Sequence, residues 1–238
     1  MAIDTISESV DSAPHIGTGL LAVFCDLAPE WRSDFRPWLV EDMFPPRVAI
    51  GFGPAASFDV IEGAALGAVA KPERKPQAYV TCYVAPTLGD LYGAPYQGLR
   101  VKRAPRDAAY HQRMQNQARY AAAWVGPGIE SDDRHFAPVI VIDRFDIVPA
   151  EIQGFNIWYE TEYLPACAKV PGLTRLRRYL AMEGPERHVL ITEFDDAQDV
   201  DGAVWQALRR SEQWDRCRFA PGAPATYRKV LDAGPETG

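Results

Sequence analysis

Two adjacent charged residues interrupt an apolar stretch of the chain. Asp143 and Arg144 lie within residues 139–146, whose apolar run predicts a buried strand. Neighbouring side chains of a strand point to opposite faces, so one of the two must face each side of the sheet. A charge in such a poorly solvated place has a shifted pKa and suits acid–base chemistry or the anchoring of a phenolate. The alternative interpretation is a buried structural ion pair.

Two histidines are further candidates for chemistry. The chain has four histidines, no two of them at metal-ligand spacing, so we expect no metal site built by the protein alone. His188 opens a predicted strand, where it is a general base, a haem ligand or a surface histidine at the strand edge. His111 lies with Tyr110 and Arg113 in a polar segment that either lines a cavity or forms a solvated helix.

A tryptophan is followed four residues later by an acid at two places. Trp158 and Glu162 form one pair, Trp38 and Asp42 the other, and this spacing puts both members on one face of a helix. An acid in the last turn of a helix faces the negative end of the helix dipole, which indicates a cationic or hydrogen-bonding partner. Glu162 is then either a proton-transfer group or part of a latch between helix and strand. Its candidate partners are Arg144, Arg177 and Arg178.

Aromatic side chains in both halves of the chain suit the binding of planar ligands. Aromatic residues also dominate protein cores, so a core position is the alternative for each of them. The candidates for ligand binding are Trp38, Tyr79, Tyr83, Tyr110, Trp158 and Tyr159, together with Arg113.

These candidates belong to two copies of one pattern. Residues 35–45 align with residues 155–165 at a constant offset of 120, which also brings Asp26 over Asp146. After an 11-residue insertion in the first copy the offset becomes 109. Each copy has the order strand, helix, strand, strand, helix, strand of a ferredoxin-like unit. The expected domains are an N-terminal arm at residues 1–17, a first repeat at 18–130 and a second at 136–238.

The two repeats must bury both faces of their sheets. Helices cover only one face of a ferredoxin-like sheet, yet the predicted strands are nearly continuous apolar runs, as in sheets that are dry on both faces. Packing the two bare faces together within one chain satisfies this requirement. The expected fold is therefore α+β, with two tandem ferredoxin-like β-α-β-β-α-β repeats packed sheet to sheet as an intramolecular barrel.

The positions of the elements follow from apolar periodicity and turn residues. The strands are predicted at residues 19–25, 55–61, 77–84, 119–125, 139–146, 174–182, 188–194 and 225–231. The helices are predicted at residues 35–44, 88–99, 106–118, 153–164 and 203–216, with Pro45 and Pro46 ending the first.

Charge and cysteine usage exclude several classes of protein. With 25 Lys and Arg against 32 Asp and Glu the net charge is −7, which provides no cationic surface for nucleic acid or an anionic membrane. No apolar run approaches the ~20 residues that span a bilayer. The four cysteines form no C-x-x-C pair and the N-terminus lacks a signal-peptide pattern, so we expect reduced thiols and a cytoplasmic protein.

Two motifs carry a resemblance to a known superfamily. The pattern Trp-x-x-x-acid-x-x-Pro after a strand ending in Asp, with Val-Pro-Gly-Leu-x-x-x-x-Arg-Tyr at residues 170–179, resembles the EthD-like branch of the dimeric α+β barrels. The resemblance covers residues from about 18 to 230 and implies small cytoplasmic proteins that bind aromatic or polyketide-like molecules in the barrel. It includes cofactor-free isomerases, cyclases and quinone-forming monooxygenases, and tandem haem proteins such as chlorite dismutases and aldoxime dehydratases. Many EthD-like proteins have His directly after the acid, whereas Met43 and Tyr163 stand here, so a mechanism through that imidazole does not transfer.

The leading hypothesis is a cofactor-independent enzyme of the isomerase, cyclase, lyase or monooxygenase type. It would act by proton transfer on a small aromatic or polycyclic metabolite in the barrel cavity. We expect no cofactor, a small hydrophobic or aromatic ligand as partner, and a monomer or homodimer. The alternatives are a haem-binding tandem-barrel enzyme and a non-catalytic ligand-binding protein of the stress-associated type. The chemistry is expected where the copies differ, at Asp143, Arg144, His188 and the segment around His111.

Overall fold

The computed structural model describes residues 16–61 and 75–233, so most of the predicted N-terminal arm lies outside the described residues. The first half contains β1 (Gly19–Asp26), α1 (Pro29–Trp38), a π-helical turn (Leu39–Met43), α2 (Phe44–Val48), β2 (Ala55–Val60), β3 (Tyr79–Ala85), a 3-10 turn (Leu88–Leu91), α3 (Ala94–Val101), α4 (Pro105–Arg113) and β4 (Gln115–Trp124). The second half contains β5 (Val139–Ile147), a 3-10 turn (Pro149–Glu151), α5 (Ile152–Trp158), a π-helical turn (Tyr159–Tyr163), α6 (Leu164–Cys167), β6 (Leu173–Glu183), β7 (His188–Phe194), α7 (Ala197–Val200), α8 (Ala203–Arg209), a 3-10 turn (Glu212–Arg216), β8 (Cys217–Phe219) and β9 (Ala225–Ala233).

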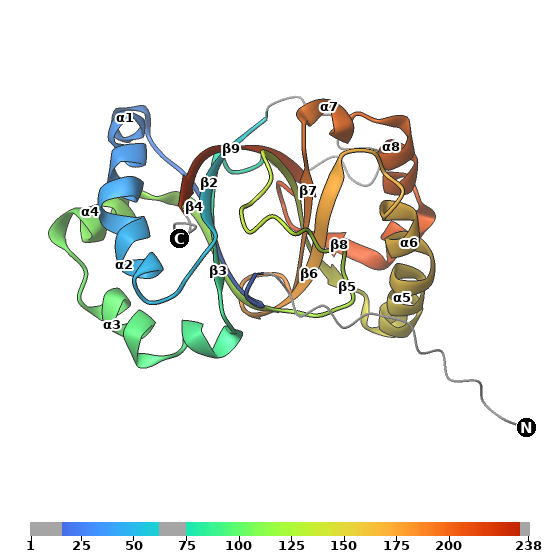
Figure 1. The fold of residues 1–238 in the computed structure, drawn as a ribbon, viewed down its shortest axis with the longest axis horizontal. Coiled ribbons are helices and arrows are strands. Elements are labelled where there is room, and N and C mark those ends of the chain that lie inside the picture. The colour runs from blue at the N-terminus through green and yellow to red at the C-terminus, as the bar shows by residue number, and fades with distance from the viewer. Residues whose placement is uncertain (1–15, 62–74, 234–238) are drawn as a thin grey trace, which may run out of the picture.

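Eight strands close into one antiparallel barrel. Around the barrel the order is β7-β6-β4-β1-β3-β2-β9-β5, and pairing of β5 with β7 joins the two ends of the sheet. β8 adds to β5 outside this ring. Figure 1 shows the barrel in the centre, with α1 to α4 on one side and α5 to α8 on the other. The predicted α+β class with a barrel is therefore confirmed.

The two halves contribute strands in the same spatial order. The first half gives the neighbours β4-β1-β3-β2 and the second gives β9-β5-β7-β6. Two antiparallel seams join the halves, because β2 pairs with β9 and β4 pairs with β6. The sheets therefore meet along their edges as well as across the interior, which the prediction of sheet-to-sheet packing did not include.

Alternating side chains separate the barrel interior from two outer cores. In β1, Leu20, Ala22 and Phe24 point inward, whereas Leu21 and Cys25 pack against the first-half helices. The inward set is one apolar cluster with members from all eight barrel strands. Each fully buried aliphatic or aromatic side chain contributes about 1.5–3 kcal/mol of burial free energy. The middle of the barrel is therefore lined by packed apolar side chains.

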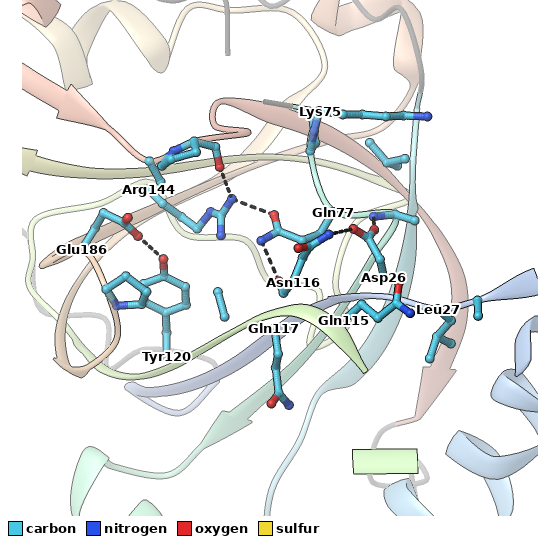
Figure 2. A pocket seen from close by; sticks show the side chains of 18 of the residues that line it. Asp26, Leu27, Lys75, Gln77, Gln115, Asn116, Gln117, Tyr120, Arg144 and Glu186 are labelled. Atoms are coloured by element: carbon cyan, nitrogen blue, oxygen red, sulfur yellow. Dashed lines mark hydrogen bonds between the residues drawn. The ribbon is translucent and has the colours of Figure 1, made fainter. Parts of the chain in front are cut away.

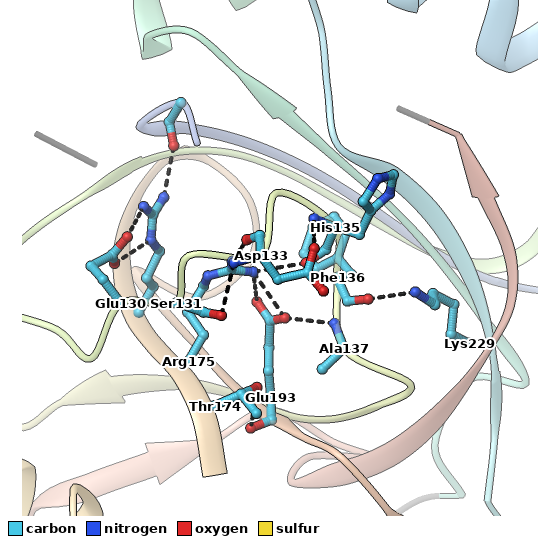
Figure 3. Close-up of polar contacts among 12 residues, drawn as sticks. Glu130, Ser131, Asp133, His135, Phe136, Ala137, Thr174, Arg175, Glu193 and Lys229 are labelled. Atoms are coloured by element: carbon cyan, nitrogen blue, oxygen red, sulfur yellow. Dashed lines mark hydrogen bonds and ion pairs between the residues drawn. The ribbon is translucent and has the colours of Figure 1, made fainter. Parts of the chain in front are cut away.

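The segment between β4 and β5 closes one end of the barrel (Figure 3). Arg175 of β6 lies with Nη1 3.0 Å from Oε1 of Glu193 of β7, and both side chains are buried. Glu193 also accepts the backbone N–H of Ala137, in the connecting segment, at 2.8 Å. Arg177 donates from Nε to Glu130 of the same segment at 2.7 Å. Ion pairs and hydrogen bonds among β6, β7 and the segment between β4 and β5 thus hold this end of the barrel together.

Each half contains a long helix that runs through proline. The first was predicted at residues 35–44 with Pro45 ending it, but it starts at Pro29 and continues through the π turn into α2. The N–H of Phe44 reaches back to the carbonyl of Leu39, five residues earlier. Pro45 then falls in the first turn of α2, where a missing N–H costs nothing. The predicted stop was therefore wrong, and the second half has the same π turn before α6.

Other element boundaries differ from the prediction because polar residues interrupt the apolar periodicity of the sequence. The helix predicted at residues 106–118 is α4, which ends at Arg113, and β4 begins at Gln115. The first three residues of β4 are polar and exposed, so apolar alternation starts only at Ala118. The helix predicted at residues 203–216 is α8 followed by a 3-10 turn, and the short β8 had no counterpart in the prediction.

Candidate functional site

A pocket of about 830 Å³, here called the mouth pocket, lies at the barrel end opposite the segment that joins β4 to β5. Its wall comes from the ends of β1 and β2, the starts of β3 and β4, part of β5, and the turn between β6 and β7. This volume is within the range of about 300–1,000 Å³ typical of small-molecule sites. Figure 2 shows the polar side chains that converge here from both halves, including Asp26, Gln77, Asn116, Tyr120, Arg144 and Glu186.

Arg144 places a buried cation in the mouth pocket. β5 points this side chain into the barrel, where it is 2% exposed and its guanidinium carbon lies 4.3 Å from the centre of the Phe24 ring. Its Nη2 donates to Oε1 of Gln77 at 2.9 Å and to the carbonyl of Pro221 at 3.5 Å (Figure 2). The partners that hold the guanidinium in place are thus uncharged.

Among the buried arginines of the described residues, Arg144, Arg47 and Arg178 have no carboxylate partner. Arg175, Arg177 and Arg209 are buried and each pairs with a carboxylate. Within the described residues no carboxylate forms an ion pair with Arg144. A buried charge without a counterion is costly, so this position favours an anionic ligand.

Tyr120 and Glu186 form a hydrogen-bonded pair on the wall of the mouth pocket. The phenolic O–H of Tyr120 donates to Glu186, which lies in the turn before β7 (Figure 2). Burial raises the pKa of Tyr120; the charge of Arg144 opposes this rise and the hydrogen bond to Glu186 adds to it. Tyr120 therefore keeps its proton at neutral pH.

Asp26 organises the rim of the mouth pocket. Its two oxygens accept the backbone N–H of Ala78 and the Nδ2 of Asn116, both at 2.7 Å. Asn116 has a φ of 48°, a left-handed conformation that Asn tolerates better than most residues. Asp146, which aligns with Asp26, accepts the backbone N–H of Arg187 at 2.8 Å. The two backbone donors are themselves 109 residues apart, which is the offset of the repeat, so both copies use the aligned acid in the same way.

Asp143 faces away from the mouth pocket. It lies on the helix side of β5, is fully buried, and accepts a hydrogen bond from Nη1 of Arg209 at 3.0 Å. Burial raises the pKa of Asp143, while the charge and hydrogen bonds of Arg209 oppose this rise. Of the adjacent charged pair, Arg144 thus points into the barrel. Asp143 belongs to a buried ion pair in the outer core.

The two candidate histidines lie outside the mouth pocket. His188 stacks on Phe145 with ring centres 5.3 Å apart, on the helix side of β7. Burial, together with the charge of Arg178, lowers the pKa of His188 to about 4, so this ring is neutral at physiological pH. His111 lies on α4 with Nε2 3.2 Å from Oδ1 of Asp107. The structure therefore does not bring either histidine together with Arg144.

The aromatic candidates build the two outer cores. Trp38 stacks on Tyr110 with ring centres 4.5 Å apart, beneath the first-half helices. Arg113 lies 3.7 Å from the ring centre of Trp31. The remaining members of the set lie in the same two cores: Tyr79, Tyr83, Trp158 and Tyr159. These aromatic side chains thus lie in the outer cores rather than in the mouth pocket, and Tyr83 also lines a smaller pocket in the outer layer.

Glu162 lies in the π turn of the second half and is exposed, whereas Trp158 is buried. The guanidinium groups of the proposed partners bind elsewhere. Arg144 binds Gln77, Arg177 binds Glu130, and Arg178 binds Asn156. The expected arginine partner of Glu162 has no support in these contacts.

Comparisons with known proteins identify the fold. No protein-family model and no curated protein matches the sequence. Three solved structures that match are a provisionally assigned monooxygenase from Lactobacillus acidophilus NCFM (12% identity, TM-score 0.53, covering 91% of this chain and 96% of that one), an anthrone oxidase-like protein (10%, 0.55, 92% and 93%) and a variant of chlorite dismutase from Candidatus Nitrospira defluvii (10%, 0.54, 91% and 92%). The chain has the dimeric α+β barrel fold. At such low identities the similarity concerns the fold alone.

The haem alternative does not fit the described residues of this dimeric α+β barrel. The cavity beside His111 is about 180 Å³, below the range for a large planar ligand. One face of His188 is covered by Phe145, and the groove beside it carries the charged side chain of Arg187. In the described part of the chain no group of three or more His, Cys, Asp or Glu is placed to hold a metal ion. None of the described helices combines the length and the apolar character that a bilayer span requires.

The sequence pointed to one member of the mouth pocket, Arg144, and missed its neighbours. Tyr120 lies in a strand of small apolar residues, and Glu186 lies in a turn, where an acid is unremarkable. The available signal was Asp26, which follows an apolar strand in the first copy as Asp146 does in the second. This match was used only to align the two copies. The side chains of the mouth pocket come from strand ends in both halves, which are far apart in the sequence. They therefore show no regular local spacing that a sequence pattern could reveal.

Proposed function

We propose that the mouth pocket binds a small aromatic or polycyclic metabolite as its anion and moves a proton to or from it without a cofactor. The observation that carries this proposal is Arg144, a buried guanidinium that no carboxylate pairs with among the described residues. It lies in a pocket of about 830 Å³, large enough for a molecule of two or three fused rings.

Each polar group in the pocket has a role in this proposal. Arg144 holds the phenolate or enolate oxygen by charge-assisted hydrogen bonds. Glu186 takes the proton from an acidic O–H or C–H of the ligand, and the O–H of Tyr120 keeps that carboxylate oriented. In an isomerase or cyclase Glu186 returns the proton to another atom of the same molecule, so no electrons are exchanged. A monooxygenase of this type needs O₂ as a second substrate.

We also propose that the halves are tandem ferredoxin-like repeats of the EthD-like branch, at residues 18–130 and 136–238. Three features support this assignment. The strands have the same spatial order in both halves, a π turn precedes the proline-containing helix in each, and Asp26 and Asp146 accept equivalent backbone N–H groups.

Two probes test binding and proton transfer separately. 1-Hydroxy-2-naphthoate, a planar phenol with a carboxylate, should quench tryptophan fluorescence of the wild type and bind at least about tenfold more weakly to Arg144→Met. Anthrone, whose CH₂ group is acidic, should exchange hydrogen with deuterated water faster with the wild type than with Glu186→Gln. Unchanged affinity in the Arg144 variant contradicts the proposal. Binding without catalysed exchange favours the non-catalytic alternative.

A further inference from the structure

A second and smaller pocket lies in the outer layer of the first half. It has a volume of about 180 Å³ and lies between the outward faces of β1, β3 and β4 and the helices α2, α3 and α4. Four arginines line it, Arg47, Arg100, Arg103 and Arg119, together with His111. No acidic side chain is among its lining residues. We call it the arginine pocket.

The charges around the arginine pocket do not balance. Arg103 pairs with Asp107, at 3.2 Å, and Arg119 pairs with Glu183. Within the described residues Arg47 and Arg100 form no ion pair. Four guanidinium charges minus two carboxylate charges leave an excess of two positive charges among these groups. The pocket is therefore electrostatically suited to a dianion.

Buried donors without partners point to a ligand in the arginine pocket. Arg47 is 5% exposed, and its Nη1 donates to the carbonyl of Met43 at 2.9 Å, which fixes the guanidinium. In the described part of the chain the Nε of Arg47 and the hydroxyl of Tyr83, which is 1% exposed, have no hydrogen-bond partner. Tyr96 accepts from Nη2 of Arg119 at 3.4 Å, which leaves its own O–H to donate. These buried donors are therefore available to hydrogen-bond a ligand in the pocket.

We propose that the arginine pocket binds a phosphate-sized dianion, either inorganic phosphate or the phosphate end of a small phosphomonoester. Its volume equals that of about six water molecules at ~30 Å³ each, which is enough for the five heavy atoms of phosphate. The same volume is too small for the aromatic ligands considered for the mouth pocket. Guanidinium groups bind phosphate oxygens in a fork geometry, and tyrosine hydroxyls add neutral donors.

The arginine pocket and the mouth pocket share Gln117 but otherwise have different lining residues, so this proposal does not depend on the proposed function. β4 lies between them, with Ala118 and Tyr120 facing the barrel and Arg119 facing the helices. The second half offers a comparison, because the repeat offset of 120 places Cys167 where Arg47 stands. Cys167 is a buried thiol in the outer core. The repeat therefore packs without an arginine at this position, and the cation of the first half is free to serve a ligand.

Calorimetric titration of the full chain with inorganic phosphate at low ionic strength tests the proposal. We expect one site per chain and a higher melting temperature with phosphate. Arg47→Met and Arg100→Gln should each weaken phosphate binding at least about tenfold, and Tyr83→Phe by a few fold. Arg178→Met is the matched control, because Arg178 is a buried arginine, 6% exposed, that binds the uncharged Asn156 in the other half. It should keep the affinity of the wild type.

Two further measurements identify the ligand and keep the test informative if one of the variants does not fold. Tighter binding of glycerol 3-phosphate than of phosphate identifies a phosphomonoester site, and weaker binding identifies a free-phosphate site. The proposal is overturned if succinate, a dicarboxylate of the same charge, binds more tightly than either, or if millimolar phosphate does not bind to the wild type. Equal affinity in the wild type and Arg100→Gln also overturns it. Arg100 is only half-buried, so that variant remains informative where Arg47→Met does not fold.

Discussion

Replacing Arg144 by methionine separates a structural charge from a ligand-binding one. The change removes the hydrogen bond to Gln77, worth about 1.5–3 kcal/mol for a charged donor, and the contact with the Phe24 ring, worth about 0.5–2 kcal/mol. It also removes the desolvation cost of a buried cation that lacks a counterion, which is several kcal/mol. Because these terms oppose each other, we expect the free energy of unfolding to stay within about 2 kcal/mol of the wild type.

Arg209→Met provides the contrast for that measurement. It leaves the fully buried Asp143 without its counterion, and breaking such a pair costs about 3–5 kcal/mol. Urea unfolding followed by tryptophan fluorescence gives both free energies of unfolding. If Arg144→Met is as destabilising as Arg209→Met, Arg144 is a structural residue and the reasoning is refuted.

The same Arg144 variants should separate in ligand affinity. Loss of one charge-assisted interaction, about 1.5–3 kcal/mol, weakens 1-hydroxy-2-naphthoate binding about 10- to 100-fold in Arg144→Met. Arg144→Lys keeps the charge and loses the fork of parallel donors, so its Kd should be intermediate. Fluorescence titration measures all three Kd values, and equal values in the three proteins contradict an anion anchor at this position.

Three other predictions concern His188, the aligned acids Asp26 and Asp146, and haem. His188→Tyr, which introduces the residue found at the aligned position Tyr79, should flatten the pH dependence of stability. The pKa of His188 is about 4 in the folded state and about 6.5 in the unfolded state. The wild type is therefore fully stabilised above pH ~6.5 and loses up to roughly 3 kcal/mol as the pH falls towards 4. Parallel stability curves for the two proteins in urea between pH 4 and 7 would show that the histidine is not responsible. Asp26→Asn and Asp146→Asn should each lower the free energy of unfolding by about 1–2 kcal/mol, and Asp26→Asn should lower it more because Asp26 accepts a second hydrogen bond. Denaturation curves that coincide with that of the wild type would contradict a stabilising role of these hydrogen bonds. Haem added to the protein should give no stoichiometric Soret band, and a band abolished by His188→Ala or His111→Ala would rescue the haem alternative.

Strands buried on both faces could be read from the sequence. The apolar runs at residues 139–146 and 188–194 became β5 and β7 within one residue at each end, because burial on both faces leaves a nearly continuous apolar run. β4 was found late because its first residues, from Gln115, are exposed and polar. The helix was cut short at Pro45 because a local proline rule does not foresee a preceding π turn.

The candidate site was predictable only where neighbouring residues in the sequence were informative. Alternation required Asp143 and Arg144 to face opposite sides, but their orientation depends on the pairing of β5 with β7 and β9. Tyr120 and Glu186 are 66 residues apart and meet because β4 pairs with β6 across the two halves. Such a contact depends on tertiary register, which a single sequence does not encode in a local pattern.

The two halves of the barrel belong to one chain, so the two seams between them form in an intramolecular, first-order process. Two separate polypeptides would have to meet by collision, so their folded fraction would fall on dilution. Here residues 125–138 tether the halves, at an effective local concentration of about millimolar for a short linker. The pairings of β2 with β9 and β4 with β6 therefore form independently of protein concentration, and they cover strand edges that would otherwise template aggregation.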